Sequence, residues 1–373
     1  MATAYSREDR LHRLRLIRSE NIGPITFHQL LARFGSAERA LAAIPDLAKQ
    51  GGRGKALKLA SLSSVTAEID RVAALGGRLL FCGEPDYPPL LAQCDDAPPA
   101  LCVKGDVPLL RRPCIALVGA RNASLNGQKL AEQMAQTLAE AGICVISGLA
   151  RGIDGAAHRG GLTAGATGAV IAGGIDIVYP PEHDALQAEI ATRGILIAEM
   201  PPGTQPQARH FPRRNRVIAG IALATVVIEA AEGSGSLISA QLAADYGREV
   251  MAVPGSPLDP RAKGSNKLLK TGATLVEDAG DILSALPLLN RRLAEPQPDL
   301  FRSPPPADPD AVELARARPI LCEMLSPSPV AVDELLRRCQ FSPAVVQTIL
   351  LELELAGRLE RHPGGQVALL MVR

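Results

Sequence analysis

Eight short apolar segments alternate with stretches of helical periodicity through the middle of this 373-residue chain. The apolar segments cover residues 78–82, 114–120, 143–148, 167–173, 195–200, 224–230, 249–255 and 273–277. The predicted helices cover 126–141, 153–163, 183–192, 212–220, 236–246 and 264–271. This alternation predicts a mainly parallel, doubly wound α/β sheet. Such a sheet binds ligands in the loops that follow the carboxyl ends of its strands.

The segment 200–236 has the composition of an anion site. Residues 200–228 contain no Asp or Glu, but they contain Phe211 and four arginines. The arginines are Arg209, Arg213, Arg214 and Arg216. The strand 224–230 then leads to Gly233, Ser234, Gly235 and Ser236, where a helix is predicted to begin. Free N–H groups at a helix start and fork-shaped guanidinium groups both bind phosphate, so we expect a phosphate or polyphosphate site.

Two earlier strand-end loops also place an arginine beside glycine. In 118–124, Gly119 permits a tight turn, Arg121 supplies a cation and Ser124 a hydroxyl. This loop lacks the spaced glycines of GxGxxG, so a dinucleotide fingerprint is not supported.

The second loop, 147–162, combines a flexible backbone with polar side chains. Gly148 and Gly152 free the backbone, and Arg151 is expected to face the ligand. Asp154 is expected to cap the following helix. His158 lies four residues later, and a structural pair with Asp154 is favoured over an acid–base dyad.

Catalysis is the minority interpretation. GxSxG, HExxH, a P-loop lysine and metal-spaced His/Cys clusters are all missing from the sequence. The acidic residues near the loops are expected to cap turns or hold arginines; they are Asp154, Asp176, Glu199 and Glu229. Tyr179, with Pro180, is expected to form a stiff part of a turn. We therefore expect a binding protein with no metal, no cofactor and no turnover.

The two ends of the chain predict separate modules around an α/β domain at 76–288. Residues 1–75 are predicted to be helical, with a Gly23-Pro24 hairpin at 21–26 that either touches DNA phosphates or docks on protein. Residues 289–310 are a Pro-rich linker, and 311–373 have a winged-helix pattern. The last module balances 7 Lys/Arg against 7 Asp/Glu, so a protein-binding role is at least as favoured as duplex-DNA binding.

Charge and composition narrow the class of partner. The net charge is +1, but residues 1–80 carry 13 Lys/Arg against 7 Asp/Glu, which is +6. The aromatic content is 3% with no Trp, so phosphate contacts rather than base stacking should dominate, with Phe211 the candidate for stacking. Seven cysteines without a CxxC pair predict reduced thiols in the cytoplasm. The chain has neither a signal core at its start nor an uncharged apolar run of about 20 residues, so no membrane role is expected.

Nine motifs within residues 118–274 together resemble the DprA/Smf family of DNA-processing proteins. In order they are VGARNAS, SGLARGID, HRGGL, GIDIVYP, EMPPGTQP, FPRRNRVIAG, VIEAAEGSGSLI, AVPG and GSNKLLKTGA. The resemblance implies an extended Rossmann-like domain between a SAM-like or helix-hairpin-helix module and a winged helix. It also implies a homodimer that protects incoming single-stranded DNA and loads RecA recombinase onto it in natural transformation, without cofactor or turnover.

The resemblance also implies which residues contact DNA. They are Arg121, Arg151, Arg209, Phe211, Arg213, Arg214, Asn215 and Arg216, with the backbone amides of Ser234, Gly235 and Ser236. Asn266, in the last motif, is implied to be structural. Some relatives have a lysine directly after the YP of GxDxxYP, where this chain has Pro181 and Glu182.

A nucleotide-processing enzyme is the rival hypothesis. The Gly/Ser loop after Glu229 also resembles Rossmann-like phosphoribohydrolases, which act on nucleoside monophosphates. Their PGGxGTxxE signature is replaced here by EGSGSLISA, with alanine at the glutamate position.

Overall fold

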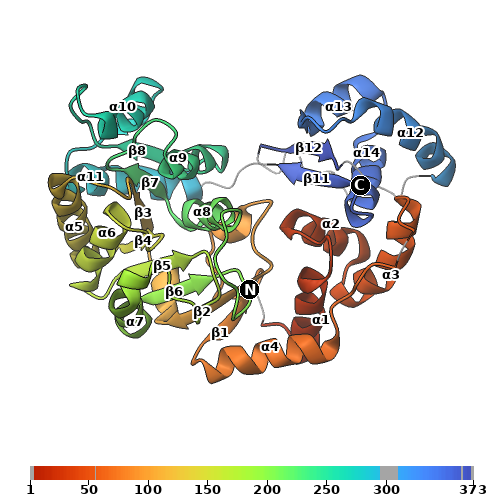
Figure 1. Cartoon of the computed structure of the whole chain (residues 1–373), viewed down its shortest axis with the longest axis horizontal. Helices are drawn as coiled ribbons and strands as arrows, with labels where there is room; N and C mark the ends of the chain where they lie inside the picture. Colours follow the sequence, from red (N-terminus) through yellow and green to blue (C-terminus); the bar gives the residue numbers. More distant parts are fainter. Residues whose placement is uncertain (1–3, 55, 295–309, 363, 371–373) are drawn as a thin grey trace. The chain divides into compact units, whose positions relative to one another are not determined.

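The structure is a computed structural model that describes residues 4–54, 56–294, 310–362 and 364–370 (Figure 1). It divides into two compact units. The larger unit is formed by the described residues of Met1–Ala4 and Ala67–Gln297, and the smaller by those of Tyr5–Thr66 together with Pro298–Arg373. Each unit is described by itself.

A nine-stranded sheet forms the centre of the larger unit, in the order β1-β2-β6-β5-β4-β3-β7-β8-β9. The strands are β1 (Arg78–Phe81), β2 (Ala100–Gly105), β3 (Cys114–Val118), β4 (Cys144–Ser147), β5 (Thr167–Ile171), β6 (Ile195–Ala198), β7 (Ala224–Val227), β8 (Glu249–Ala252) and β9 (Thr274–Leu275). From β6 to β9 all neighbours are parallel, whereas β1 and β2 are antiparallel additions at one edge. The predicted mainly parallel α/β sheet is therefore confirmed.

Helices cover both faces of this sheet (Figure 1). The helices after the parallel strands are α5 (Leu125–Glu140), α6 (Ile153–Leu162), α7 (Asp184–Arg193), α8 (His210–Ile221), α9 (Gly235–Asp245), α10 (Lys263–Lys270) and α11 (Ala279–Ala294). Apolar residues of α5, α6 and α11 share one buried cluster, and those of α8 and α9 share another. Each cluster includes side chains from one face of the strands, so the sheet is buried on both sides, as parallel sheets require.

Strand β2 is absent from the sequence prediction. Its residues, ALCVKG, follow Pro98 and Pro99 and include Lys104, so they form no conspicuous apolar run. The strand exists because both of its edges are paired: Cys102 is opposite Leu79 of β1, and Val103 is opposite Ile197 of β6. These partners are distant in the sequence, and local propensity does not indicate them.

The smaller unit combines helices from the start of the chain with the C-terminal winged helix. Its elements are α1 (Arg7–Arg18), α2 (Pro24–Phe34), α3 (Ala37–Gln50), α12 (Ala311–Met324), β10 (Val330–Ala331), α13 (Val332–Cys339), α14 (Pro343–Leu355), β11 (Leu359–His362) and β12 (Gln366–Leu369). Helix α4 (Leu62–Ala74) crosses the boundary between the units. The predicted helical module and winged helix are thus confirmed as folds.

Helix α14 is the contact between these two modules. Its residues Leu351 and Leu355 belong to the core of the N-terminal helices, around Phe27 and Ile44. In the 21–26 hairpin, the Asn21 side chain donates to the Leu355 carbonyl at 3.3 Å. This hydrogen bond ties the hairpin to the winged helix of the same chain.

The predicted linker 289–310 coincides only partly with the described residues. Its first six positions, 289–294, are the end of α11. Residues 295–309 lie outside the described residues, so the linker stays a prediction. None of the described helices combines the length and apolar character that crossing a bilayer requires.

Candidate phosphate-binding site at the sheet switch point

The strand order reverses beside β3, and the predicted site lies at that point. The chain proceeds from β3 through β4 and β5 to β6 in one direction, and then returns to β7 on the other side of β3. In doubly wound sheets, the carboxyl ends of the strands at such a switch point form a crevice. The loop after β3 carries Arg121, and the loop after β7 carries Ser234.

The first turns of α8 connect these two loops. The Arg121 guanidinium carbon lies 5.2 Å from the centroid of the Phe211 ring of α8, a cation–π contact. One turn further along α8, the Asn215 amide donates to the Gly235 carbonyl at 3.2 Å. Arg213 lies between these two residues on α8 and is exposed. The structure thus brings together the loop after β3, the loop after β7 and the first turns of α8.

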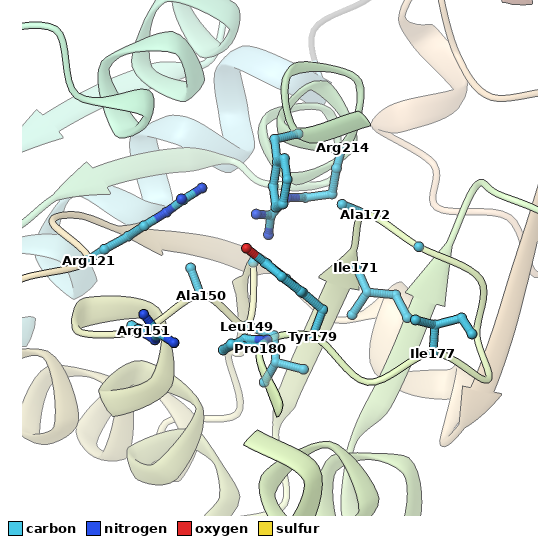
Figure 2. A pocket seen from close by; sticks show the side chains of 13 residues that line it. Arg121, Leu149, Ala150, Arg151, Ile171, Ala172, Ile177, Tyr179, Pro180 and Arg214 are labelled. Atoms are coloured by element: carbon cyan, nitrogen blue, oxygen red, sulfur yellow. The ribbon is translucent and has the colours of Figure 1, made fainter. Parts of the chain in front are cut away.

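A cavity of about 50 Å³ opens beside Arg121 (Figure 2). Its walls come from the loops after β4 and β5, from α8 and from the Tyr179-Pro180 segment. The rings of Tyr179 and Phe211 lie 5.6 Å apart, tilted by 57°. Tyr179 is 46% exposed, so the predicted stiff turn also offers an aromatic surface.

Arg214 forms the back of this cavity, and Gly148 makes room for it. Arg214 is only 7% exposed, and its Nη1 donates to the Val170 carbonyl at 3.0 Å. A Cβ on Gly148 would lie 1.5 Å from that Nη1, so any other residue would displace the guanidinium. Burial lowers the pKa of Arg214, whereas attraction from Asp154 raises it. Arg214 therefore supplies buried positive charge beneath the cavity rather than an exposed contact.

Asp154 and His158 are structural, but not in the way the sequence predicts. Asp154 does not cap α6, whose N-cap is Gly152; its Oδ2 instead accepts from the N–H groups of Gly148 and Ala150 at 3.2 and 3.3 Å. His158 accepts at Nε2 from the Leu149 N–H at 3.3 Å, and its Nδ1 faces Thr167 Oγ1 at 2.8 Å. The predicted Asp154–His158 pair is wrong, because each side chain holds a separate part of the same loop.

This loop has a constrained backbone. Leu149 is fully buried and adopts a φ of 55°, which is costly for a residue with a Cβ. Gly152 adopts a φ of 70°, and a Cβ there would meet the Ala120 carbonyl at 2.3 Å. Burial lowers the pKa of His158 to about 3, so its ring is neutral when it accepts from Leu149. Buried hydrogen bonds thus fix the loop between Gly148 and Gly152, including the exposed Arg151.

The start of α5 is occupied by a carboxylate from the chain itself. Glu229 accepts from the Ser124 N–H at 2.9 Å and from Ser124 Oγ at 2.5 Å. Ser124 Oγ in turn caps α5 by accepting from the Gly127 N–H at 2.8 Å. Gly119 is packed just before this turn, where a Cβ would lie 2.5 Å from Ile153. Ser124 and Gly119 therefore build the loop, and the anion at this helix start is Glu229 rather than a phosphate.

The Gly/Ser loop after β7 also uses several of its polar groups internally. The Ser234 N–H donates to the Ala231 carbonyl at 3.1 Å, and the Ser236 N–H faces Ser234 Oγ at 3.4 Å. The two hydroxyls are 2.8 Å apart. Gly235 between them is exposed, so the accessible backbone of this loop centres on Gly235.

The four arginines around α8 fall into two groups. Arg209 and Arg213 are exposed, whereas Arg214 and Arg216 are buried. Arg216 forms an ion pair with Glu199 and donates to the Asp96 carbonyl. This arrangement argues against the predicted DNA contact of Arg216, because its guanidinium is already paired inside the protein.

Two further residues predicted to be structural also tie loops together. Asp176 accepts from the Gly203 N–H at 2.7 Å and pairs with Arg71 at 2.6 Å. Asn266 accepts from the Gly255 N–H at 3.1 Å and donates to the Gly255 carbonyl at 2.8 Å. Asp176 lies in a loop and Asn266 lies on α10, and each fixes the backbone of a segment distant in the sequence.

Sequence reasoning missed one charged partner at the cavity rim. Arg151 forms an ion pair with Glu182, which follows the Tyr179-Pro180 segment. The unusual acidic residue after the YP motif was visible in the sequence. Its pairing with an arginine 31 positions earlier was not, because it depends on the adjacency of the loops after β4 and β5.

The family models that match this chain cover each of its parts. The model described as DNA recombination-mediator protein A matches residues 78–287. A DprA-like N-terminal HHH domain matches residues 7–70, and a DprA winged helix domain matches residues 304–365.

Similar proteins and solved structures agree with these matches. The chain is 38% identical to Protein Smf of Escherichia coli K12 over 285 residues, which is 76% of this chain and 75% of that protein. It is 42% identical to the DNA processing protein DprA of Bacillus subtilis 168 over 212 residues, 56% of this chain and 71% of the relative. The X-ray structure of DNA processing protein A from Streptococcus pneumoniae aligns with a TM-score of 0.62 and 33% identity, covering 75% of this chain and 98% of that one. DNA processing protein A from Helicobacter pylori aligns with a TM-score of 0.52 and 26% identity, covering 57% and 96%.

Proposed function

This chain belongs to the DprA/Smf family of DNA-processing proteins, and from that premise we propose that its switch-point site clamps the backbone of single-stranded DNA without regard to sequence. The observation that carries the proposal is the cation–π pair of exposed Arg121 with Phe211 at the switch point, beside an aromatic-walled cavity that Arg151 and Arg214 also line. Guanidinium groups held on a rigid scaffold bind successive phosphates and carry no sequence information.

The proposed roles of the arginines in the site follow from how deeply each is buried. Arg121, Arg209 and Arg213 are exposed and supply phosphate contacts, while buried Arg214 adds positive potential beneath the cavity. Phe211 and Tyr179 provide ring faces on which one base can stack. Ser124 and Arg216 are left out of the proposed contacts. Ser124 already donates a hydrogen bond to Glu229, and Arg216 already forms an ion pair with Glu199.

The relatives support the same class of ligand. The solved structure of the Helicobacter pylori protein describes a single-stranded DNA binding mode of that protein, and the alignment covers 57% of this chain. In keeping with the family, we also propose that the chain acts as a homodimer in the cytoplasm and delivers the bound strand to RecA recombinase. A dimer would engage two stretches of one strand and gain affinity by raising the effective concentration of the second site.

Recombinase delivery has a direct test. The purified chain should speed RecA assembly on single strands that are already coated by a single-strand-binding protein, and analytical ultracentrifugation should give twice the chain mass. If the chain binds DNA but leaves the rate of RecA assembly unchanged, the proposed DNA clamp stands and the proposed delivery to RecA is wrong.

We further propose that the site binds without turnover. Glu229, at the end of the strand that leads to the Gly/Ser loop, is held by Ser124 at the start of α5, which leaves it poorly placed to act on a substrate. Incubation with each nucleoside monophosphate should therefore release no free base. Release of base would favour the rival phosphoribohydrolase function.

The clamp itself is tested by removing two exposed arginines. The double substitution Arg121→Ala and Arg213→Ala should weaken binding to oligo-dT about tenfold or more. It should also flatten the plot of log K against log salt by about 0.7 per lost phosphate contact. Fluorescence anisotropy at several salt concentrations gives both values.

Arg112 offers a matched control. It is exposed and lies two residues before the start of β3, so it lies at the opposite end of that strand from Arg121. Arg112→Ala removes one positive charge, as Arg121→Ala or Arg213→Ala alone does, and should leave affinity and salt slope nearly unchanged. Equal losses in Arg112→Ala and in either single variant would mean that net charge, not this site, determines binding.

A further inference from the structure

Glu182 places a negative charge at the rim of the proposed phosphate site. It lies in the 3-10 helix η3 (Pro181–His183), directly after the Tyr179-Pro180 segment that forms one wall of the cavity. Its carboxylate forms an ion pair with Nε of Arg151, another residue of the cavity. Both side chains are largely open to solvent, with exposures of 44% and 61%.

The position of η3 does not depend on this ion pair. The neighbouring residue His183 makes its own contact with the loop after β4, because its Nδ1 lies 3.0 Å from the Leu149 carbonyl. Leu149 is fully buried and is itself held by His158. The two loops are therefore joined at His183, and loss of the Glu182 charge should leave their geometry intact.

A carboxylate and a phosphate compete for the same face of a guanidinium. Each presents anionic oxygens that accept from its N–H donors, so Arg151 cannot fully serve both at once. The pairing also changes both groups: Glu182 raises the pKa of Arg151, and Arg151 lowers the pKa of Glu182. Glu182 thus remains charged and available as a competitor near neutral pH.

We propose that Glu182 is an intramolecular competitor of the DNA phosphate at Arg151, and that it holds the affinity of the site below what its arginines would give. The inference rests on the proposed function, since it concerns the same site. A strand that binds must displace Glu182 from Arg151 before Arg151 contacts phosphate. Exposed ion pairs are weak, so phosphate can displace Glu182, but Arg151 then contacts phosphate in only a minor part of the bound complexes. The bound strand therefore dissociates more readily than it would without Glu182.

The test is a double-mutant cycle on Arg151 and Glu182. Binding of oligo-dT is measured by fluorescence anisotropy over a range of salt for the wild type, Glu182→Gln, Arg151→Ala and the double variant. Glu182→Gln should tighten binding about three- to tenfold and steepen the salt slope by about 0.7, the value for one further phosphate contact. Arg151→Ala should cost less than about twofold in the wild type, but about fivefold in the Glu182→Gln background.

Glu189 provides a matched control on α7. It pairs with Arg193 at 2.6 Å in an exposed ion pair, and neither residue lines the cavity. Glu189→Gln removes the same charge and frees an arginine, so it should change the affinity by less than about 1.5-fold if the effect is local.

Three results would overturn the inference. Weaker binding by Glu182→Gln would mean that Glu182 positions Arg151 for DNA. Unchanged binding would mean that the ion pair has no bearing on the site, and equal tightening by Glu189→Gln would assign the effect to net charge. Failure of the proposed function looks different, because the folded wild type would then not bind oligo-dT, or would bind as well with both Arg121 and Arg213 replaced.

Discussion

The switch-point loops of the larger unit and the helix-turn-helix of the smaller unit both have patterns typical of nucleic-acid contact, but they differ in what is exposed. At the switch point, Arg121 and Arg213 are exposed. In the smaller unit, the second helix of the helix-turn-helix, α14, is buried along most of its length. Arg361 of the wing pairs there with Glu354 at 2.8 Å and reaches Gln29 of α2 at 3.3 Å.

The difference lies in how many faces of an element are apolar. Helix α14 is apolar on more than one side, and a helix of that kind is buried. One side contributes Ile349 and Leu353 to the winged-helix core, and the other contributes Leu351 and Leu355 to the core of the N-terminal helices. A helix-turn-helix pattern therefore does not ensure a free recognition surface. In the smaller unit, α14 is therefore buried by contacts within the chain along most of its length.

The largest expected effect comes from a charged substitution at Leu355, which tests whether α14 is needed for the stability of the smaller unit. This residue is fully buried between the two modules, so Leu355→Asp should lower the free energy of unfolding of the smaller unit by about 3–5 kcal/mol. Urea denaturation followed by circular dichroism measures the loss. Affinity for oligo-dT should stay within about twofold, because the proposed contacts lie in the larger unit.

Ile320→Asp is the control for this change. Ile320 lies on α12 and is 43% exposed, so the same charge should be tolerated there. If Leu355→Asp abolished DNA binding while the larger unit stayed folded, the clamp would have to extend into the smaller unit.

A second prediction concerns the rigidity of the switch-point loop. The pKa of His158 falls from 6.5 to about 3 in the folded protein because the ring is buried. Between these values the unfolded chain binds a proton that the native state does not, so stability is complete above about pH 6.5 and falls with decreasing pH by at most about 1.4 kcal/mol per unit. His158→Gln should remove this dependence between about pH 6 and pH 4. At about pH 7.5 it should cost about 1–3 kcal/mol through the lost contacts with Leu149 and Thr167.

Denaturation of the larger unit at a series of pH values measures both effects. His12 lies on α1 in the smaller unit, and His12→Gln should leave the pH dependence of the larger unit as it is. An unaltered pH slope in His158→Gln would show that His158 does not account for the acid sensitivity.

The smallest expected effect compares one arginine from each unit. Arg338 of α13 is 71% exposed and pairs with Glu334 at 2.7 Å. Arg338→Ala should change the affinity for oligo-dT by less than about twofold, whereas Arg213→Ala alone should lower it about three- to fivefold. Anisotropy at a single low salt concentration distinguishes them. Similar losses of affinity for both variants would place DNA on both units and contradict a binding site confined to the larger unit.

Much of the fold was predictable because its signals are local. The alternation of apolar strands and helices gave a mainly parallel sheet, and the predicted bounds of α5, α6 and α9 differ from the observed bounds by one residue at most. Strand β2 escaped prediction because its stability comes from pairing with β1 and β6. Among the predicted site residues, Arg121 and Arg213 are exposed, whereas Arg216 is paired internally.

The sequence by itself determined the family, the doubly wound sheet and the loops in which the arginines lie, because motifs and hydrophobic periodicity are written along the chain. The tertiary structure decided which of those polar groups remain available. Glu229 accepts a hydrogen bond from Ser124, Glu199 forms an ion pair with Arg216, and Glu182 forms one with Arg151. In each pair the two residues are more than ten positions apart in the sequence. Availability depends on burial and on the nearest opposite charge, and both are set only when distant segments pack together.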